Sequence, residues 1–552
     1  MVLQGFSLLP LVLWSTQSRK YLKHSTYIFC NYIDLDLCDS EFFIGVTNLT
    51  TGFLRYTPSQ LIYFRFLGNP YTLFNHKVSG LHWLFSPLCT HSFLNMERIL
   101  WLDSLRGIAS ALVVIHHSKS SEPKSIVGFL TRSYWDQPPE ENRRLIQLPP
   151  FRLLFNGPSM VALFIVISGY AISLPLLRCR EHIRENNLAF FRRLCSAATR
   201  RIFRIYLPSI AILFLSQLVY FCNVFQWKAA DDWLGGLKPL TAPWAHIQYV
   251  LSRIVHLLDI SNHQVDINFD HNRPDMRTIN YQLWTMPIEF RGSCAVYLLI
   301  LTFSFWRPWP RYLALAGVAT YWFYMGHWDL FAFVSGILLA ERHVSSESEP
   351  DGEIALSYSS PSLEIQKPII KSWNKFTESI YLRHLGTSVW FILGLYLLCM
   401  CGADRLAREY EWLVVARSPE WDNAEMMPRC WRSVGAVLTI YAISKSTLLQ
   451  RPLNSQLLQY LGKISFPLYL VHPTIYLALK WPVRDFLWWA VTKTHYPGTI
   501  EASEHALPFS ITCMGTMLVL GVVMVVASEL WNRFVDMKCL GVARRFEKWV
   551  SC

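Results

Sequence analysis

Residues 99–118 are long and apolar enough to cross a lipid bilayer, yet they carry Asp103, Arg106, His116 and His117. Charged groups inside a spanning segment are costly, so they mark a candidate functional site. Arg106 and His117 are eleven positions apart, which is about three full helical turns and an axial rise of about 16 Å. The two side chains therefore share one helix face, near opposite ends, and His116 points away from it.

Asp103 precedes Arg106 by three positions, close enough for the two side chains to pair on one helix face. Two interpretations remain open. The charges and histidines could form an interfacial ion pair and a helix cap, or they could form a working site in which His117 is the active imidazole.

The rest of the chain also favours a membrane protein. It has 552 residues, of which 52% are hydrophobic, and it contains several apolar runs of about 20 residues. We therefore predict an all-α, polytopic integral membrane bundle of about ten transmembrane helices. The expected spans lie near residues 99–117, 159–177, 201–225, 287 onward, 312–324, 329–340, 385–401, 434–449, 461 onward and 509–530.

The formal net charge of +12 comes from arginines that cluster beside these runs, which favours cytoplasmic anchoring at a bilayer over nucleic-acid binding. The loop predicted between residues 178 and 204 carries eight arginines and two glutamates, so we place it in the cytoplasm. With an even number of spans, both ends of the core are cytoplasmic. Segment 119–152 is expected on the non-cytoplasmic side, yet it is weakly basic, which disagrees mildly with this topology. The thirteen cysteines show no metal-site or disulfide spacing, and we expect no metal.

Within the arginine-rich segment, Arg201 and Arg204 form an R-x-x-R unit whose side chains face the same way on a helix. A topology signal explains this unit as well as a ligand site does. As a ligand site, an arginine pair is suited to phosphate groups.

Four segments, taken in order, resemble the acyltransferase-3 family of membrane enzymes, which move acyl groups from acyl-CoA to hydroxyls. The first is Asp103-Ser104-Leu105-Arg106-Gly107 with the apolar run that ends at His117. The other segments are LFIVISGY at 163–170, YQLWTMPIEFRGS at 281–293 and SFPLYLVH at 465–472. The third segment is similar to fungal-type members in particular. Apart from these four segments, the R-x-x-R unit formed by Arg201 and Arg204 also resembles the family.

The resemblance begins near residue 96, so we predict an acyltransferase-3-like domain over 96–552. It includes a polar cytoplasmic loop at 341–384. Residues 1–95 are a leader of doubtful status, either non-native or a membrane-associated extension, and the glycosylation pattern at Asn48 has little weight there. The H-x-x-x-D pattern at 271–275 is interpreted as coincidence.

The resemblance implies roles for the residues of the first helix and of the R-x-x-R unit. His117 would act as the base that takes the proton from the acceptor hydroxyl. Arg106, held by Asp103, would position the thioester end of the donor or stabilise negative charge. Arg201 and Arg204 would bind the phosphates of acyl-CoA.

Two further candidate site residues, Glu289 and His472, each have two interpretations. Glu289 stands just after Pro287 at the start of a span, where the helix dipole favours a carboxylate. It either is a structural carboxylate, paired with Arg291 or exposed at the interface, or it shares the pocket of His117 and orients or charges that imidazole. His472 either lines the acceptor cavity or is structural.

The expected activity is O-acylation by acyl-CoA, with acetyl as the default group, of a hydrophobic small molecule such as a terpenoid or polyketide. The expected location is the endoplasmic reticulum membrane. Alternatives are a glycan or lipid-sugar O-acyltransferase, a proton-coupled transporter, which the intramembrane charges also suit, and a non-catalytic relative. No G-x-S-x-G nucleophile motif is present, which argues against a serine enzyme.

Overall fold

The computed structural model describes residues 99–119, 130, 132–183, 186–227, 236–261, 279–348, 380–400, 407–421 and 425–550. The chain divides into two units, Met1–His91 and Ser92–Cys552, and all of the described residues belong to the second. The expected leader 1–95, the glycosylation pattern at Asn48 and the 271–275 pattern lie outside the described residues.

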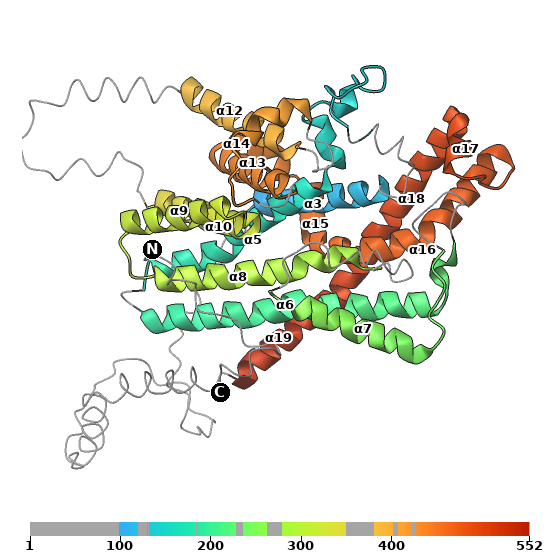
Figure 1. Ribbon diagram of the computed structural model, residues 1–552. Helices are drawn as coiled ribbons and strands as arrows, with labels where there is room; N and C mark the ends of the chain where they lie inside the picture. The colour runs from blue at the N-terminus through green and yellow to red at the C-terminus, as the bar shows by residue number, and fades with distance from the viewer. Residues whose placement is uncertain are drawn as a thin grey trace, which may run out of the picture. The chain divides into compact units, whose positions relative to one another are not determined.

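Regular structure in the described residues is helical throughout, without strands, which confirms the predicted all-α class (Figure 1). The α-helices are α3 (Leu100–Lys119), α5 (Gly157–Arg180), α6 (Asn187–Phe221), α7 (Pro243–Leu258), α8 (Thr285–Thr302), α9 (Pro308–Tyr324), α10 (Trp328–Ser348), α12 (Ile380–Leu398), α13 (Met426–Lys445), α14 (Thr447–Leu453), α15 (Gln456–Lys463), α16 (Ser465–Thr492), α17 (Thr499–Glu504), α18 (Ala506–Trp531) and α19 (Met537–Val550). The shorter helical turns include η3 (Phe151–Phe155), η7 (Tyr281–Trp284) and η9 (Arg408–Val414), and the π-helical turn η10 (Asn532–Asp536) joins α18 to α19.

Three of the described helical segments are long and apolar enough to cross a membrane: Gly157–Arg180, Asn187–Phe221 and the continuous segment Ala506–Val550. A further apolar helix, Leu385–Leu398, is shorter. The predicted count of about ten spans is therefore not confirmed. Each of the other expected spans overlaps a helix, but these helices are shorter or carry more polar and charged side chains among their apolar residues.

Two expected loops are partly helical. In the arginine-rich segment, α5 continues to Arg180 and α6 begins at Asn187, because the side chain of Asn186 accepts the backbone N–H of Ala189 and caps the helix. Arg201 and Arg204 thus lie well inside α6 and not at its start. In the expected polar loop 341–384, α10 extends to Ser348 and α12 begins at Ile380, and residues 349–379 are not described.

Helix α5 lies at the centre of the described bundle and packs against α3, α8, α10 and α13 (Figure 1). Glycines bring its backbone close to that of α10. Gly169 faces the backbone of Phe333, and a Cβ atom placed on Gly336 would lie 2.6 Å from the backbone nitrogen of Tyr170. Gly107 of α3 and Gly462 of α15 allow a second close approach. In lipid, where apolar burial adds little, such small-residue contacts are a main source of helix association.

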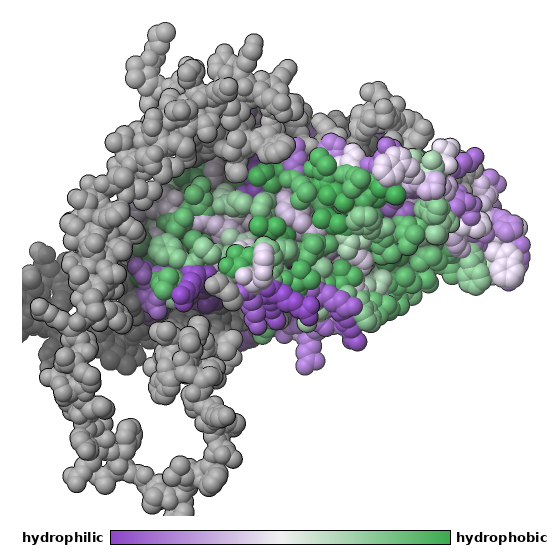
Figure 2. Space-filling model, turned by 90° about the horizontal axis from the view of Figure 1, so that it is seen from below, coloured by the Kyte–Doolittle hydropathy of each residue, from purple (hydrophilic) through white to green (hydrophobic). Residues whose placement is uncertain are grey.

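Apolar side chains cover much of the surface. Figure 2 shows one face on which hydrophobic residues form a broad area bordered by hydrophilic ones. Helix α7 contributes exposed Trp244, Ile247, Leu251, Val255 and Leu258, which recur at helical spacing. Apolar areas of this extent are unusual on water-soluble proteins and fit contact with a bilayer.

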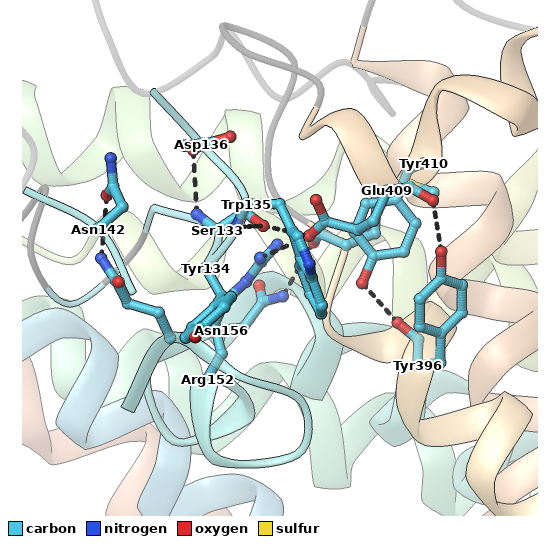
Figure 3. A network of polar contacts seen from close by, with 12 residues as sticks. Ser133, Tyr134, Trp135, Asp136, Asn142, Arg152, Asn156, Tyr396, Glu409 and Tyr410 are labelled. Carbon is cyan, nitrogen blue, oxygen red and sulfur yellow. Dashed lines mark hydrogen bonds and ion pairs between the residues drawn. The ribbon is translucent and has the colours of Figure 1, made fainter. Parts of the chain in front are cut away.

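A polar network fixes the segment after α3 to the region between α12 and α13 (Figure 3). Buried Arg152 donates to Glu409 at 3.0 Å, and the Ser133 hydroxyl donates to the same carboxylate. The hydroxyl of Tyr396 donates to the backbone carbonyl of Glu409, and that of Tyr410 donates to the carbonyl of Tyr396 at 2.7 Å. Buried charge is tolerated here because the carboxylate and guanidinium are paired.

We predict that Gly336→Ala destabilises the protein, because the new methyl group meets backbone that cannot move aside. The expected cost is about 1–3 kcal/mol of unfolding free energy, measured by thermal unfolding in detergent. Gly317→Ala in α9 is the matched control, since a Cβ there meets nothing within 4 Å. It should be neutral or stabilising, because alanine favours helix by about 1 kcal/mol. Equal effects of the two changes would contradict the close α5–α10 contact.

Candidate functional site

A cavity of about 530 Å³ lies between α3, α5, α6, α8, α16 and α19. Its wall is apolar on the side of α5 and strongly basic on the side of α6. Among the described residues, six arginines and one carboxylate line it: Arg106, Arg193, Arg200, Arg201, Arg204, Arg544 and Glu289. The excess of positive charge suits an anionic ligand with several acidic groups.

Glu289, in the second turn of α8, forms an ion pair with Arg201 of α6 at 2.5 Å. Ser168 of α5 joins the two, since its hydroxyl donates to Glu289 at 2.8 Å and accepts from Arg201 at 3.0 Å. Arg201 also donates to Ser293 at 2.9 Å. Three helices are thus tied together at one wall of the cavity, and the charge of Arg201 is largely neutralised.

This arrangement corrects the expected role of Glu289. Its carboxylate contacts Arg201 and Ser168, and neither of the two partners considered from the sequence, His117 and Arg291. Arg291 pairs instead with buried Asp329 of α10. The carboxylate of Glu289 binds the guanidinium of Arg201 instead. Because Arg201 belongs to another helix, no spacing within residues 281–293 predicts this ion pair.

Arg106 lines the cavity from α3. It pairs with Asp103 at 3.4 Å, as the three-residue spacing predicts, and its Nε donates to the Ser465 hydroxyl at 3.0 Å. Ser465 begins α16, and its backbone carbonyl accepts from Ser110 at 2.9 Å. The α3–α16 contact therefore holds the guanidinium in place at the cavity wall.

His117 lies at the other end of α3, in a cluster of rings. Its Nδ1 is 2.5 Å from the hydroxyl oxygen of Tyr281, and the two rings stack with centroids 4.7 Å apart. The ring of His472 meets it edge-on at 5.1 Å. His116 is turned to another partner, the backbone carbonyl of Phe155, at 2.8 Å. The two adjacent histidines thus have different environments, as their angular separation predicts.

His472 is 1% exposed, and its Nδ1 contacts the carbonyls of Leu468 and Tyr469. Its Nε2 is buried without a hydrogen-bond partner among the described residues. A buried polar atom left unpaired is costly and marks a place where a polar ligand or water would be stabilised. His472 does not line the basic cavity.

Tyr469 lies between the cavity and the ring cluster. It lines the cavity, its ring is 6.1 Å from that of His472, and its hydroxyl donates to the carbonyl of Gln282 at 2.6 Å. Thr285 also lines the cavity and is 2.8 Å from that hydroxyl. The basic cavity and the His117 cluster are therefore neighbours, joined through the segment that precedes and starts α8.

The structure brings Arg106, Arg201, Arg204 and Glu289 of the predicted site into one cavity and groups His117 with His472. Further residues of the site were not predicted from the sequence: the ring partner Tyr281 and the cavity residues Ser168, Arg193, Arg200, Tyr469 and Arg544. Arg193, Arg200 and Arg204 share one helical face, because seven residues separate the first two and four separate the last two, and this spacing is a usable signal. For Arg544, far away in the C-terminal segment, no local signal exists.

Comparisons with known proteins found a family match and several relatives. A family model described as an acyltransferase domain matches residues 99–528. The "O-acetyltransferase PaAT-1" of Phomopsis amygdali is 28% identical over 67% of this chain and 71% of its own length. The "Acyltransferase clz18" of Cochliobolus lunatus is 22% identical and the "Acyltransferase R4" of a Phoma species 23% identical. Each of these two covers 79% of this chain and 93% of its own length. No solved structure matches the chain.

We predict energetic coupling between Arg201 and Glu289. Arg201→Met and Glu289→Gln should each destabilise the protein, and the double variant should lose about 0.5–3 kcal/mol less than their sum, because each single change strands a partly buried charge. Thermal unfolding in detergent measures this cycle. Glu347→Gln removes the separate partner of Arg178 and should be additive with Arg201→Met. Additivity in both cycles would contradict the ion pair.

Proposed function

The chain belongs to the acyltransferase-3 family, and we propose that it is a membrane-bound O-acyltransferase using acyl-CoA as donor. In this proposal it moves an acetyl group to a hydroxyl of a hydrophobic small molecule, a specialised metabolite such as a terpenoid or polyketide. One relative is named an O-acetyltransferase, which favours acetyl as the group. The endoplasmic reticulum membrane, with both core ends cytoplasmic, is the location we propose.

The observation that carries the donor proposal is the charge of the cavity. Six arginines face a volume of about 530 Å³, and one glutamate among the lining residues opposes them. Uncompensated charge inside a membrane protein is costly, so such a cavity favours a polyanion. Coenzyme A combines several phosphate charges with a long uncharged arm, and the cavity combines a basic wall with an apolar one.

In the proposed reaction the acceptor hydroxyl attacks the thioester carbonyl carbon, and the C–S bond breaks. His117 takes the hydroxyl proton as the new C–O bond forms. The proton then passes to the leaving thiolate, which departs as free coenzyme A. The acylated acceptor is the second product, so no covalent enzyme intermediate is needed.

Tyr281 sets the state in which His117 performs this step. We assign the short contact as Nδ1–H of His117 donating to the Tyr281 oxygen, because this tautomer leaves the basic lone pair on Nε2. The stacked Tyr281 ring also holds the plane of the imidazole. The buried Nε2 of His472 beside it would bind a polar group of the acceptor or a water molecule.

Arg106 and His117 have separate tasks in this proposal. They are about 16 Å apart along α3, so the guanidinium is too distant to stabilise an oxyanion at the imidazole. We therefore assign Arg106 to hold the donor, together with Arg204, which lines the same cavity. Asp103 keeps Arg106 in place, and Glu289 keeps Arg201 in place.

The test is comparative metabolite profiling by mass spectrometry of the host strain, a deletion strain and strains carrying single variants. We expect deletion and His117→Ala both to remove one compound and to accumulate its partner lighter by one acyl group. His116→Ala is the matched control, because that imidazole contacts the backbone of Phe155 and lies off the shared face. It should keep the acylated compound.

In membranes, labelled acetyl-CoA should yield free coenzyme A with the unaltered protein and with His116→Ala. With His117→Ala the rate should fall by at least about 100-fold, the usual contribution of a general base. Full activity of a well-folded His117→Ala protein would remove the imidazole from the mechanism. Loss of the compound on deletion, without any consumption of acetyl-CoA, would favour a transporter.

A further inference from the structure

The C-terminal helix α19 follows α18 through the π-helical turn η10 and packs against α6, which it crosses at an angle (Figure 1). It is firmly packed there, because Ala543 is fully buried and the rings of Phe546 and Phe203 are 5.0 Å apart. Glu547 also pairs with Arg200 of α6 at 3.7 Å. The family match ends at residue 528, so this helix is an addition to the part that the match covers.

One face of α19 forms part of the cavity wall. Leu540 and Arg544, four residues apart and therefore on the same side of the helix, both line the cavity. Arg544 is exposed, and within the described part of the chain it has neither a hydrogen-bond nor an ion-pair partner. Its neighbour Arg545 is also exposed but does not line the cavity.

Arg544 has one comparable neighbour in the cavity. Arg204 of α6 also lines the wall without a hydrogen-bond or ion-pair partner among the described residues, and the carboxylates of Asp536 in η10 and Asp103 in α3 act on it only electrostatically. Other lining arginines are already engaged. Arg201 pairs with Glu289 and Arg106 with Asp103. Two arginines from two helices are thus available for one anionic ligand.

The position of α19 identifies which end of the donor it meets. On α6, Arg200 pairs with Glu547 and so lies beside α19. Farther along α6, Ser216 accepts a hydrogen bond from Asn280, the residue before Tyr281, and so lies beside the partner of His117. These two positions are sixteen residues apart, about 24 Å along the helix axis. The wall formed by α19 is therefore distant from His117, where the thioester must lie. The part of coenzyme A farthest from its thioester is the nucleotide, which carries the 3′-phosphate.

We propose that α19 completes the donor site and that Arg544 binds the 3′-phosphate of coenzyme A. This inference rests on the proposed use of acyl-CoA and adds a subsite from outside the family match. A guanidinium can donate two parallel hydrogen bonds to a phosphate, which gives both affinity and selectivity. Arg204 binds the inner phosphates from the neighbouring helix. The C-terminal helix thereby selects the phosphorylated form of the donor.

The experiment compares two donors, acetyl-CoA and acetyl-3′-dephospho-CoA, with protein in bilayers of neutral phosphatidylcholine, which excludes anionic lipid headgroups as competing ligands. For the unaltered protein, KM should be lower for acetyl-CoA. Arg544→Ala should raise KM for acetyl-CoA by about tenfold, leave kcat nearly unchanged, and leave KM for the dephospho donor unchanged. Arg544→Lys should recover part of the loss.

Arg545→Ala is the matched control, since it removes the same charge from the same helix away from the cavity. It should leave KM for both donors unchanged. Activity of Arg544→Ala with the dephospho donor shows that the variant is folded. An unchanged KM for acetyl-CoA, or an equal rise for both donors, would overturn the subsite while the acyltransferase proposal stands.

If the unaltered protein consumes neither donor, the proposed function fails, and equilibrium binding decides the subsite. Coenzyme A and 3′-dephospho-CoA are then titrated against the unaltered protein and Arg544→Ala. Binding of coenzyme A that weakens about tenfold in the variant, with no change for the dephospho form, supports the subsite. Equal binding of coenzyme A by the two proteins overturns it.

Discussion

The ion pair between Arg201 and Glu289 is the contact on which the cavity depends. It joins α6 to α8, and through Ser168 it reaches α5, so one charge pair fixes three walls. Charges are tolerated inside a membrane protein when they are paired or face a polar space. Because Glu289 neutralises Arg201, the positive charge that remains belongs to other arginines, among them Arg204 and Arg544. The pair thus ties three helices of the bundle together, and in the proposed donor site it leaves the phosphates of the donor to Arg204 and Arg544.

Two adjacent residues of α5 have different tasks, one in close helix contact and one at the wall of the cavity. Gly169 faces α10 and allows the two backbones to meet, while Ser168 faces the cavity and its ion pair. A change in how α5 sits against α10 would therefore rotate Ser168 relative to Glu289. The backbone contact at Gly336 limits that rotation. Helix packing and the geometry of the cavity wall therefore both depend on the position of α5.

Local periodicity predicted the α3 side of the site well. The three-residue spacing of Asp103 and Arg106 gives the observed pair, and the angular separation of the two histidines gives their different partners. Contacts between distant segments escaped prediction, because nothing within 281–293 shows that Arg201 competes for Glu289. The predicted span count stays unconfirmed for a related reason. Hydropathy locates helices, but polar and charged side chains inside them depend on partners elsewhere in the bundle, as with Arg291 and Asp329.

The length of α3 links the two halves of the site. Arg106 contacts the first residue of α16, and His117 contacts Tyr281 just before α8, so both ends of α3 are fixed to other elements. A helix that is fixed at two points acts as a rigid spacer, with eleven residues giving three turns plus about 20°. Insertion of one residue would turn His117 by about 100° away from Tyr281, and removal of one would turn it equally in the other direction. In the proposed mechanism, the spacing between Arg106 and His117 lets one ligand, bound at the basic cavity, reach the imidazole at the far end of the same helix.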